Sequence, residues 1–172
     1  CDAVAGSTSC AYCNGLAGGY APGVMETAIE QVQLAFRDRP HMQCGPGAAW
    51  LTHPAGCVFQ LIQPARITLE VSSFLVDNVY EEMVRRFPDN QSLTLVFDFS
   101  LMLGRTTASR SQLLGCMRQA VGRVRGIYLT LPPDMRPALK RSFQASMQLA
   151  NELGFEVRLS GSARQAVASC AL

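Results

Sequence analysis

The sequence predicts an α/β fold in which a mixed β-sheet of about five or six strands has α-helices packed against it. Nearly half of the 172 residues are apolar and 16% are charged, which is enough apolar material for one sizeable core. From residue 50 onward, strand-like and helix-like spacings of apolar residues follow one another in the order strand, strand, strand, helix, strand, helix, strand, helix, strand, helix. Because crossovers of helical length join parallel strands, we expect the later strands to be parallel.

The first 48 residues differ from the rest. Gly, Ala, Ser, Cys and Tyr dominate residues 1–24, which have little to bury, so we expect a flexible leader or a non-native segment. Met25 as the true start and a bacterial lipoprotein end at Cys1 remain open alternatives. In residues 25–48 we expect a short helix, from Met25 to Arg37, and then a loop. Residues 49–172 form the predicted α/β domain.

Three short strands are predicted at the start of this domain, at residues 49–52, 57–62 and 67–71. Turns rich in proline separate them, and Ile67, Leu69 and Val71 alternate with polar residues. They predict an antiparallel meander with one buried face.

Helices and strands then alternate to the end of the chain. The strands are expected to be short, and the one at residues 93–99 is apolar on both faces. The predicted elements are a helix over 75–87, a strand over 93–99, a helix over 106–121, a strand over 127–131, a long helix from Pro133 to Leu153, a strand over 155–159, and a closing helix over 162–168 capped by Ser160 or Ser162.

Charge and hydropathy argue against two classes of partner. The net charge is only +2 and the basic residues are scattered, so we expect no nucleic-acid partner. No apolar run approaches the ~20 residues of a membrane-spanning helix, and no signal peptide is visible. A cytoplasmic protein is the default expectation.

Four metal-ligating side chains lie close together in the sequence: His41 and Cys44, then His53 and Cys57. Such residues can close around zinc, but their spacing matches no familiar zinc module. In the competing interpretation Cys57 starts a buried strand and the two histidines occupy polar turns. We expect no cofactor and keep a metal- or redox-responsive protein as the weaker alternative.

Catalytic motifs are missing from the sequence. Both histidines precede the main fold, and no nucleophile elbow, P-loop or dinucleotide fingerprint occurs. Asp98 lies near the carboxyl end of its strand, where open α/β sheets often place a site. A single carboxylate is more often structural, so we expect no enzymatic activity.

A turn crowded with hydroxyl groups follows that strand: Thr106, Thr107, Ser109 and Ser111 precede the next helix. Free backbone N–H groups at a helix start can hold an anion, and the same side chains can cap the helix. We interpret the turn first as a cap, second as a partner-facing surface and third as a phosphate acceptor.

Several segments resemble the STAS family, which comprises bacterial anti-sigma factor antagonists and SpoIIAA-like relatives. The similarity covers residues 57–170 and is carried by Arg66–Met83, Leu93–Ser100, Gly126–Leu131 and Gly154–Ala166. The functional residue of the family is a Ser, in a D-S-S-G turn, that becomes phosphorylated. Here Gly104–Ser109 lacks that Asp and Gly, so Thr106 or Thr107 would have to take the role.

The resemblance implies a non-enzymatic domain that acts by protein–protein contact in bacterial regulation. A kinase-like anti-sigma factor or another signalling protein would be the partner, and a homodimer stays open. The contact surface would run from Arg105 to Ser111, with Asp98 nearby. The alternative is a SpoIIAA-like module that binds a small molecule or lipid in a pocket beneath the helix from Asp134 to Leu153, because Pro132-Pro133 and this long helix are similar to the branch related to CRAL-TRIO domains.

Overall fold

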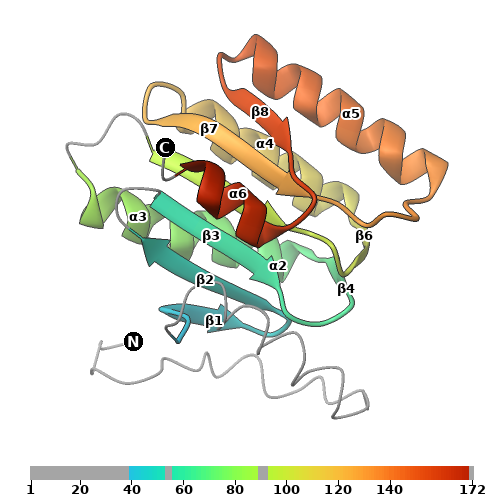
Figure 1. Ribbon diagram of the computed structural model, residues 1–172, viewed down its shortest axis with the longest axis horizontal. Helices are drawn as coiled ribbons and strands as arrows, with labels where there is room; N and C mark the ends of the chain where they lie inside the picture. The colour runs from blue at the N-terminus through green and yellow to red at the C-terminus, as the bar shows by residue number, and fades with distance from the viewer. Residues whose placement is uncertain (1–38, 53–55, 89–92, 171–172) are drawn as a thin grey trace.

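A computed structural model describes residues 39–52, 56–88 and 93–170. It confirms the α/β class: a six-stranded mixed sheet has helices packed against it, and a second, two-stranded ladder lies beside it (Figure 1). The expected leader at 1–24 and the expected helix at 25–37 lie outside the described residues.

The large sheet has the strand order β1-β2-β3-β5-β7-β8. The pairs β1–β2 and β2–β3 are antiparallel, whereas β3, β5, β7 and β8 run parallel, as expected for the later strands. The bounds are Met42–Cys44 for β1, Gly47–Thr52 for β2, Gly56–Leu61 for β3, Leu93–Asp98 for β5, Val124–Thr130 for β7 and Glu156–Leu159 for β8.

The sheet begins ahead of the predicted domain start at residue 49. Gly45 and Pro46 form the two-residue loop of a β1–β2 hairpin, in which Cys44 pairs with Gly47. Gly45 has a φ of 50°, a value that glycine adopts without strain and that tight hairpins favour. The last part of the expected loop before residue 49 is therefore a hairpin, in which the Gly-Pro-Gly cluster connects two paired strands of the sheet.

The expected strand over 67–71 is wrong. The strand β4 spans Ala65–Ile67 and ends there, because Thr68 caps the helix α2, Leu69–Ser73. The Oγ1 atom of Thr68 accepts a hydrogen bond from the backbone N–H of Val71, and this N-cap fixes the change from strand to helix. The helix continues through a π-helical segment η2, Phe74–Tyr80, into α3, Glu81–Arg86.

The strand β4 does not extend the antiparallel meander. It pairs in parallel with β6, Met102–Arg105, to form the separate ladder. This ladder brings the start of α2 next to the start of α4, Thr107–Gln119. The hydroxyl-rich turn that the sequence placed after residue 100 is thus built on a short strand.

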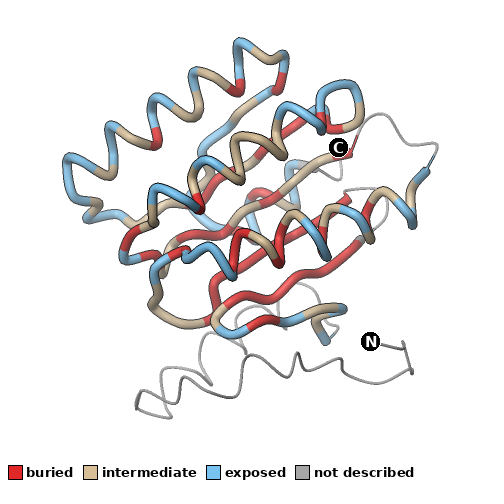
Figure 2. The backbone as a smooth tube through the Cα atoms, turned by 180° about the vertical axis from the view of Figure 1, so that it is seen from behind, coloured by how far each residue is buried: buried red, intermediate tan, exposed pale blue. Residues whose placement is uncertain are grey.

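Helices cover the two faces of the sheet unequally. The helices α2 to α4 and α5, Pro137–Glu152, lie on one face, and α6, Ala163–Cys170, lies on the other (Figures 1 and 2). The strands β3, β5, β7 and β8 are added in one direction, and right-handed crossovers then place their helices on the same side. Ser162 caps α6 by accepting from Gln165 N, as expected.

The main core lies between the sheet and these crossover helices. Its fully buried members include Phe59, Leu61, Met83 and Leu93. A smaller core around Trp50 and Val58 lies on the face of α6. Across the described parts of the chain, no helix combines the length and apolar character that a bilayer crossing requires.

Candidate functional site

Asp98, the one acid predicted near a site, is buried, and each of its carboxylate oxygens accepts a hydrogen bond. Its Oδ2 accepts from Gln60 Nε2 at 2.6 Å, and its Oδ1 accepts from the backbone N–H of Ser100 at 3.0 Å. The first bond joins β3 to β5, and the second shapes the turn after β5. Asp98 therefore has a structural role in the geometry that the chain adopts.

The four hydroxyl residues of the predicted turn divide into two pairs. Thr106 caps α4, because its Oγ1 accepts from Ser109 N at 3.1 Å. Ser109 is fully buried, and its Oγ donates to the carbonyl of Ile67 at 2.9 Å. Thr107 and Ser111, by contrast, are exposed on the first turns of α4.

The starts of α2 and α4 are held together by side chains. Gln112 lies between two serines of α2: its Oε1 accepts from Ser72 Oγ, and its Nε2 donates to Ser73 Oγ at 2.8 Å. The backbone N–H of Thr106 also donates to the carbonyl of Ile67. Together with the hydrogen bond from Ser109 Oγ to the carbonyl of Ile67, these links fix the start of α4 against α2 and the end of β4.

Around these fixed helix ends lie exposed side chains of two kinds. Leu69 at the start of α2 is 52% exposed and Leu103 on β6 is 58% exposed, while Thr107 and Ser111 add hydroxyl groups. We call Leu69, Leu103, Thr107 and Ser111 the platform. Thr107 and Ser111 belong to the stretch from Arg105 to Ser111 that the sequence predicted as a partner-facing surface, whereas Leu69 and Leu103 were not predicted there.

Arg105 does not belong to this exposed surface. Its guanidinium turns toward α5, where Nη2 lies within hydrogen-bond distance of Ser142 O (2.8 Å), Ser142 Oγ (2.6 Å) and Ser146 Oγ (3.1 Å). Its Cζ lies 4.4 Å from the ring centroid of Phe143, a cation–π contact. The expectation that Arg105 faces a partner is therefore corrected: the residue joins β6 to α5.

A cavity of about 120 Å³ lies beneath α4 and α5 against the sheet. Its floor is formed by side chains of the central strands and its roof by α4, α5 and the π-helical segment. Most of the lining is apolar, and it includes Val79, Leu95, Phe97, Leu113, Met117, Ile127, Met147 and Val157. The apolar side chains of α4 that border the cavity, such as Leu113 and Met117, are only partly buried.

Two arginines are part of the otherwise apolar lining, Arg105 and Arg110. The Nε atom of each is buried and has no hydrogen-bond partner. Within the described ranges, neither guanidinium forms an ion pair with a carboxylate. Burial, and to a lesser extent the charge of Arg110, lowers the pKa of Arg105 to about 10, so the side chain stays charged at neutral pH.

Two thiols also line the cavity. Burial raises the pKa of Cys57 to about 12. Burial, with a smaller effect from Asp77, raises the pKa of Cys116 to about 11. Both thiols are therefore neutral at physiological pH, and a neutral thiol is a poor metal ligand.

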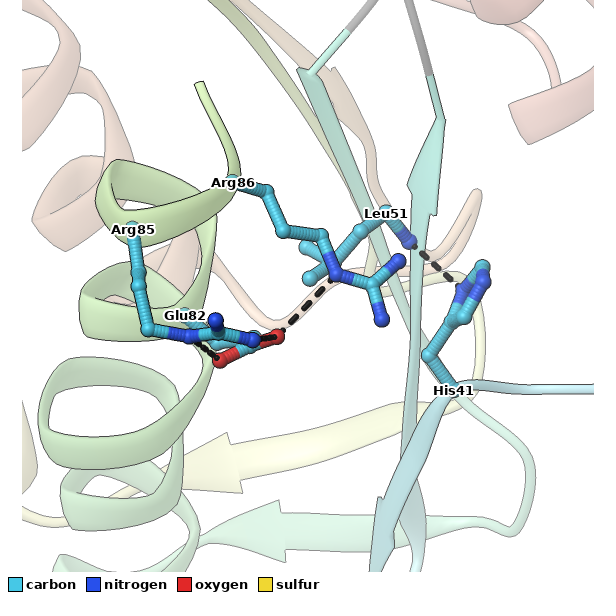
Figure 3. A network of polar contacts seen from close by, with 5 residues as sticks. All are labelled: His41, Leu51, Glu82, Arg85 and Arg86. Atoms are coloured by element: carbon cyan, nitrogen blue, oxygen red, sulfur yellow. Dashed lines mark hydrogen bonds and ion pairs between the residues drawn. The ribbon is translucent and has the colours of Figure 1, made fainter. Parts of the chain in front are cut away.

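The predicted metal ligands do not form a common site in the described residues. His41 Nδ1 accepts from the backbone N–H of Leu51 at 3.0 Å (Figure 3), while Cys44 and Cys57 are buried in β1 and β3. Figure 3 also shows the carboxylate of Glu82 bound by Arg85 and Arg86. In the described ranges, no three His, Cys, Asp or Glu side chains gather around a common point; His53 lies outside them.

Of the two arginines in the lining, Arg105 was predicted from the sequence as a partner-facing residue, whereas Arg110 was not predicted as a site residue. Arg110 did carry a usable signal, because it stands at helical spacing from Leu113, Leu114 and Met117, on the apolar stripe of α4. A charged residue on an apolar stripe indicates either an opposite charge within the protein or a ligand-binding site. Ser142 and Ser146 gave no comparable signal.

Comparisons of the chain with protein-family models, with curated proteins and with solved structures return no match.

Proposed function

We propose that the chain is a non-enzymatic STAS-like domain that acts by protein–protein contact in bacterial regulation, in the cytoplasm. The observation that carries this proposal is the platform. Its two leucines expose apolar surface beside two hydroxyls, and the links through Gln112 and Ser109 keep the underlying helix ends in place. Interfaces of this kind bind with little loss of conformational freedom, because the surface is already ordered.

Within the platform, Thr107 is the hydroxyl best placed to act as a switch. Thr106 is engaged in the cap and Ser109 is buried, whereas Thr107 is exposed at the first residue of α4. A phosphate at this position would be stabilised by the free N–H groups of the helix start. It would also add negative charge to the contact surface, which can repel or recruit a kinase-like anti-sigma factor or another signalling protein.

The substitution Thr107→Glu tests this surface. A glutamate at the first turn of α4 is favourable for the helix, so the variant should fold as stably as the parent chain. We expect it to weaken binding to a kinase-like anti-sigma factor by about tenfold or more, because a new charge without an opposite charge across the interface costs free energy on binding. The binding of purified candidate partners encoded beside this chain, measured by surface plasmon resonance, gives the result.

The matched control is Gln144→Glu, which places the same charge on the exposed side of α5, away from the platform. It should bind as the parent chain does. Equal affinity of the parent and Thr107→Glu for a partner that does bind would remove the platform from the interface.

A second candidate function rests on the cavity: the chain would be a module that binds a small apolar molecule. The position beneath α5 is the one expected for the SpoIIAA-like alternative, and the lining is almost wholly apolar. Apolar cavities of roughly 150 Å³ stay dry and bind benzene-sized molecules. A cavity of about 120 Å³ therefore suits an apolar group of similar or slightly smaller size.

Cys116 reports on occupation of this cavity. With its pKa near 11, the thiol should react with iodoacetamide at pH 8 about 100-fold more slowly than the same residue in the denatured chain. Because more thiolate forms as pH rises, the rate should climb about tenfold per unit between pH 7 and 10. Hexanol bound in the cavity should slow the alkylation of Cys116 further, because the thiol lies in the cavity lining. Mass spectrometry of the Cys116 peptide measures the rate.

A Cys116 rate that levels off near pH 9 would show an ordinary, exposed thiol. A rate that saturating hexanol leaves unchanged would argue against occupation of the cavity.

A further inference from the structure

We propose that the cavity binds a small amphipathic anion: a carboxylate attached to an apolar group of about six carbons, with the carboxylate held between Arg105 and Arg110. This inference rests on the second candidate function, the binding of an apolar molecule, and adds the charge and class of the ligand.

The first argument is the charge balance of the lining. Two guanidinium groups border one apolar cavity, close enough for Arg110 to lower the pKa of Arg105. Four ion pairs occur in the described part of the chain, and none of them includes either residue. Two like charges in a poorly solvated place destabilise each other, and an anion between them would reverse that effect.

The second argument is the unused hydrogen-bonding capacity. Arg105 is already anchored through Nη2 to Ser142 and Ser146, yet its Nε–H has no acceptor. The Nε–H of Arg110 is likewise buried without an acceptor. Buried donors are normally satisfied, so two such donors at one cavity indicate a missing acceptor.

The third argument is the shape of the ligand. A planar carboxylate offers two oxygens, which matches two separate Nε–H donors. The apolar remainder of the lining is formed by side chains such as Leu113, Met117 and Phe97. An acyl chain or ring of about six carbons would fill a volume near 120 Å³ without bringing a second polar group into it.

The two arginines differ in how firmly their side chains are held. Arg105 is held by α5 and stacked on Phe143, whereas no hydrogen bond from the side chain of Arg110 is found in the described residues. Arg110 is therefore the better residue to replace, because no hydrogen bond or ion pair of its side chain is found in the described residues. A methionine there keeps the bulk and removes a half-buried charge, which often stabilises a fold.

The test is an NMR titration of the full chain with hexanoate, observing the arginine Nε–H signals, alongside hexanol as the uncharged probe. Hexanoate should bind with a dissociation constant at or below about 1 mM and should shift the Nε–H signals of Arg105 and Arg110. Hexanol should bind about tenfold more weakly. Arg110→Met should lose about tenfold or more in affinity for hexanoate and little for hexanol, while Arg118→Met, on the exposed side of α4, should bind as the parent does.

Each contrary result has a distinct meaning. Equal binding of hexanoate and hexanol, or unchanged hexanoate binding by Arg110→Met, would overturn the carboxylate assignment and leave the apolar cavity as a binding site. Failure of both probes to bind would overturn the cavity function as well. Hexyl phosphate binding more than about tenfold tighter than hexanoate would overturn the choice of carboxylate.

Discussion

Replacement of Phe59 with alanine should lower the free energy of unfolding by about 3–5 kcal/mol. Phe59 is fully buried in β3, and its ring lies 6.4 Å from that of Phe97 and 6.1 Å from that of Phe99. Phe99 in turn packs 6.1 Å from Phe143 of α5, so one cluster connects the sheet to the helix layer. Removal of the Phe59 ring creates a cavity at the centre of this cluster, which a rigid sheet cannot close.

Chemical denaturation followed by circular dichroism measures this loss. Val121→Ala is the control, because Val121 is 48% exposed and its truncation should change the free energy of unfolding by no more than about 0.5 kcal/mol. A loss below about 1 kcal/mol for Phe59→Ala would contradict the central position of the ring.

The second large effect is expected for Gly56→Ala, with a loss of about 2 kcal/mol or more. Gly56 opens β3 with a φ of 98°, a conformation that strains any residue with a side chain. An added Cβ would also lie 2.6 Å from the carbonyl oxygen of Thr94, the residue that pairs with Gly56 in β5. Since that neighbour is backbone, the β3–β5 pair would have to separate.

Gly115→Ala provides the matched control for this prediction. Gly115 lies within α4, and an added Cβ would meet no atom within 4 Å. The same change should therefore raise the free energy of unfolding by about 0.5–1 kcal/mol, because alanine favours the helix. Urea denaturation of both variants decides the matter, and equal effects would contradict the account given for Gly56.

Local signals in the sequence sufficed for most of the fold. The apolar run from Leu93 to Phe99 predicted the central strand, and Thr106 and Ser162 marked the starts of α4 and α6. These features depend on neighbours within about four residues, which the sequence displays directly. Thr68 is the instructive failure: it alternates with apolar residues as a strand residue would, yet it caps a helix.

The site was less accessible to sequence reasoning, because it depends on contacts between distant segments. Arg105 contacts residues more than thirty positions away on α5, and nothing near it in the chain predicts this direction. The ladder of β4 and β6 was equally hard to predict, since strands of only three and four residues show little periodicity in the sequence. Such short pairs form because the larger sheet brings them together.

The one-directional winding of the sheet has a consequence for synthesis on the ribosome. The helices of the three crossovers pack on one face of the sheet as the chain emerges. The main core beneath them can therefore form without α6. The opposite face, with Trp50 and Val58, is covered within the described chain by α6, which follows every other described element in the sequence. A released chain that ends before Ala163 would therefore present this apolar face to chaperones, although the crossover helices could still pack on the other face.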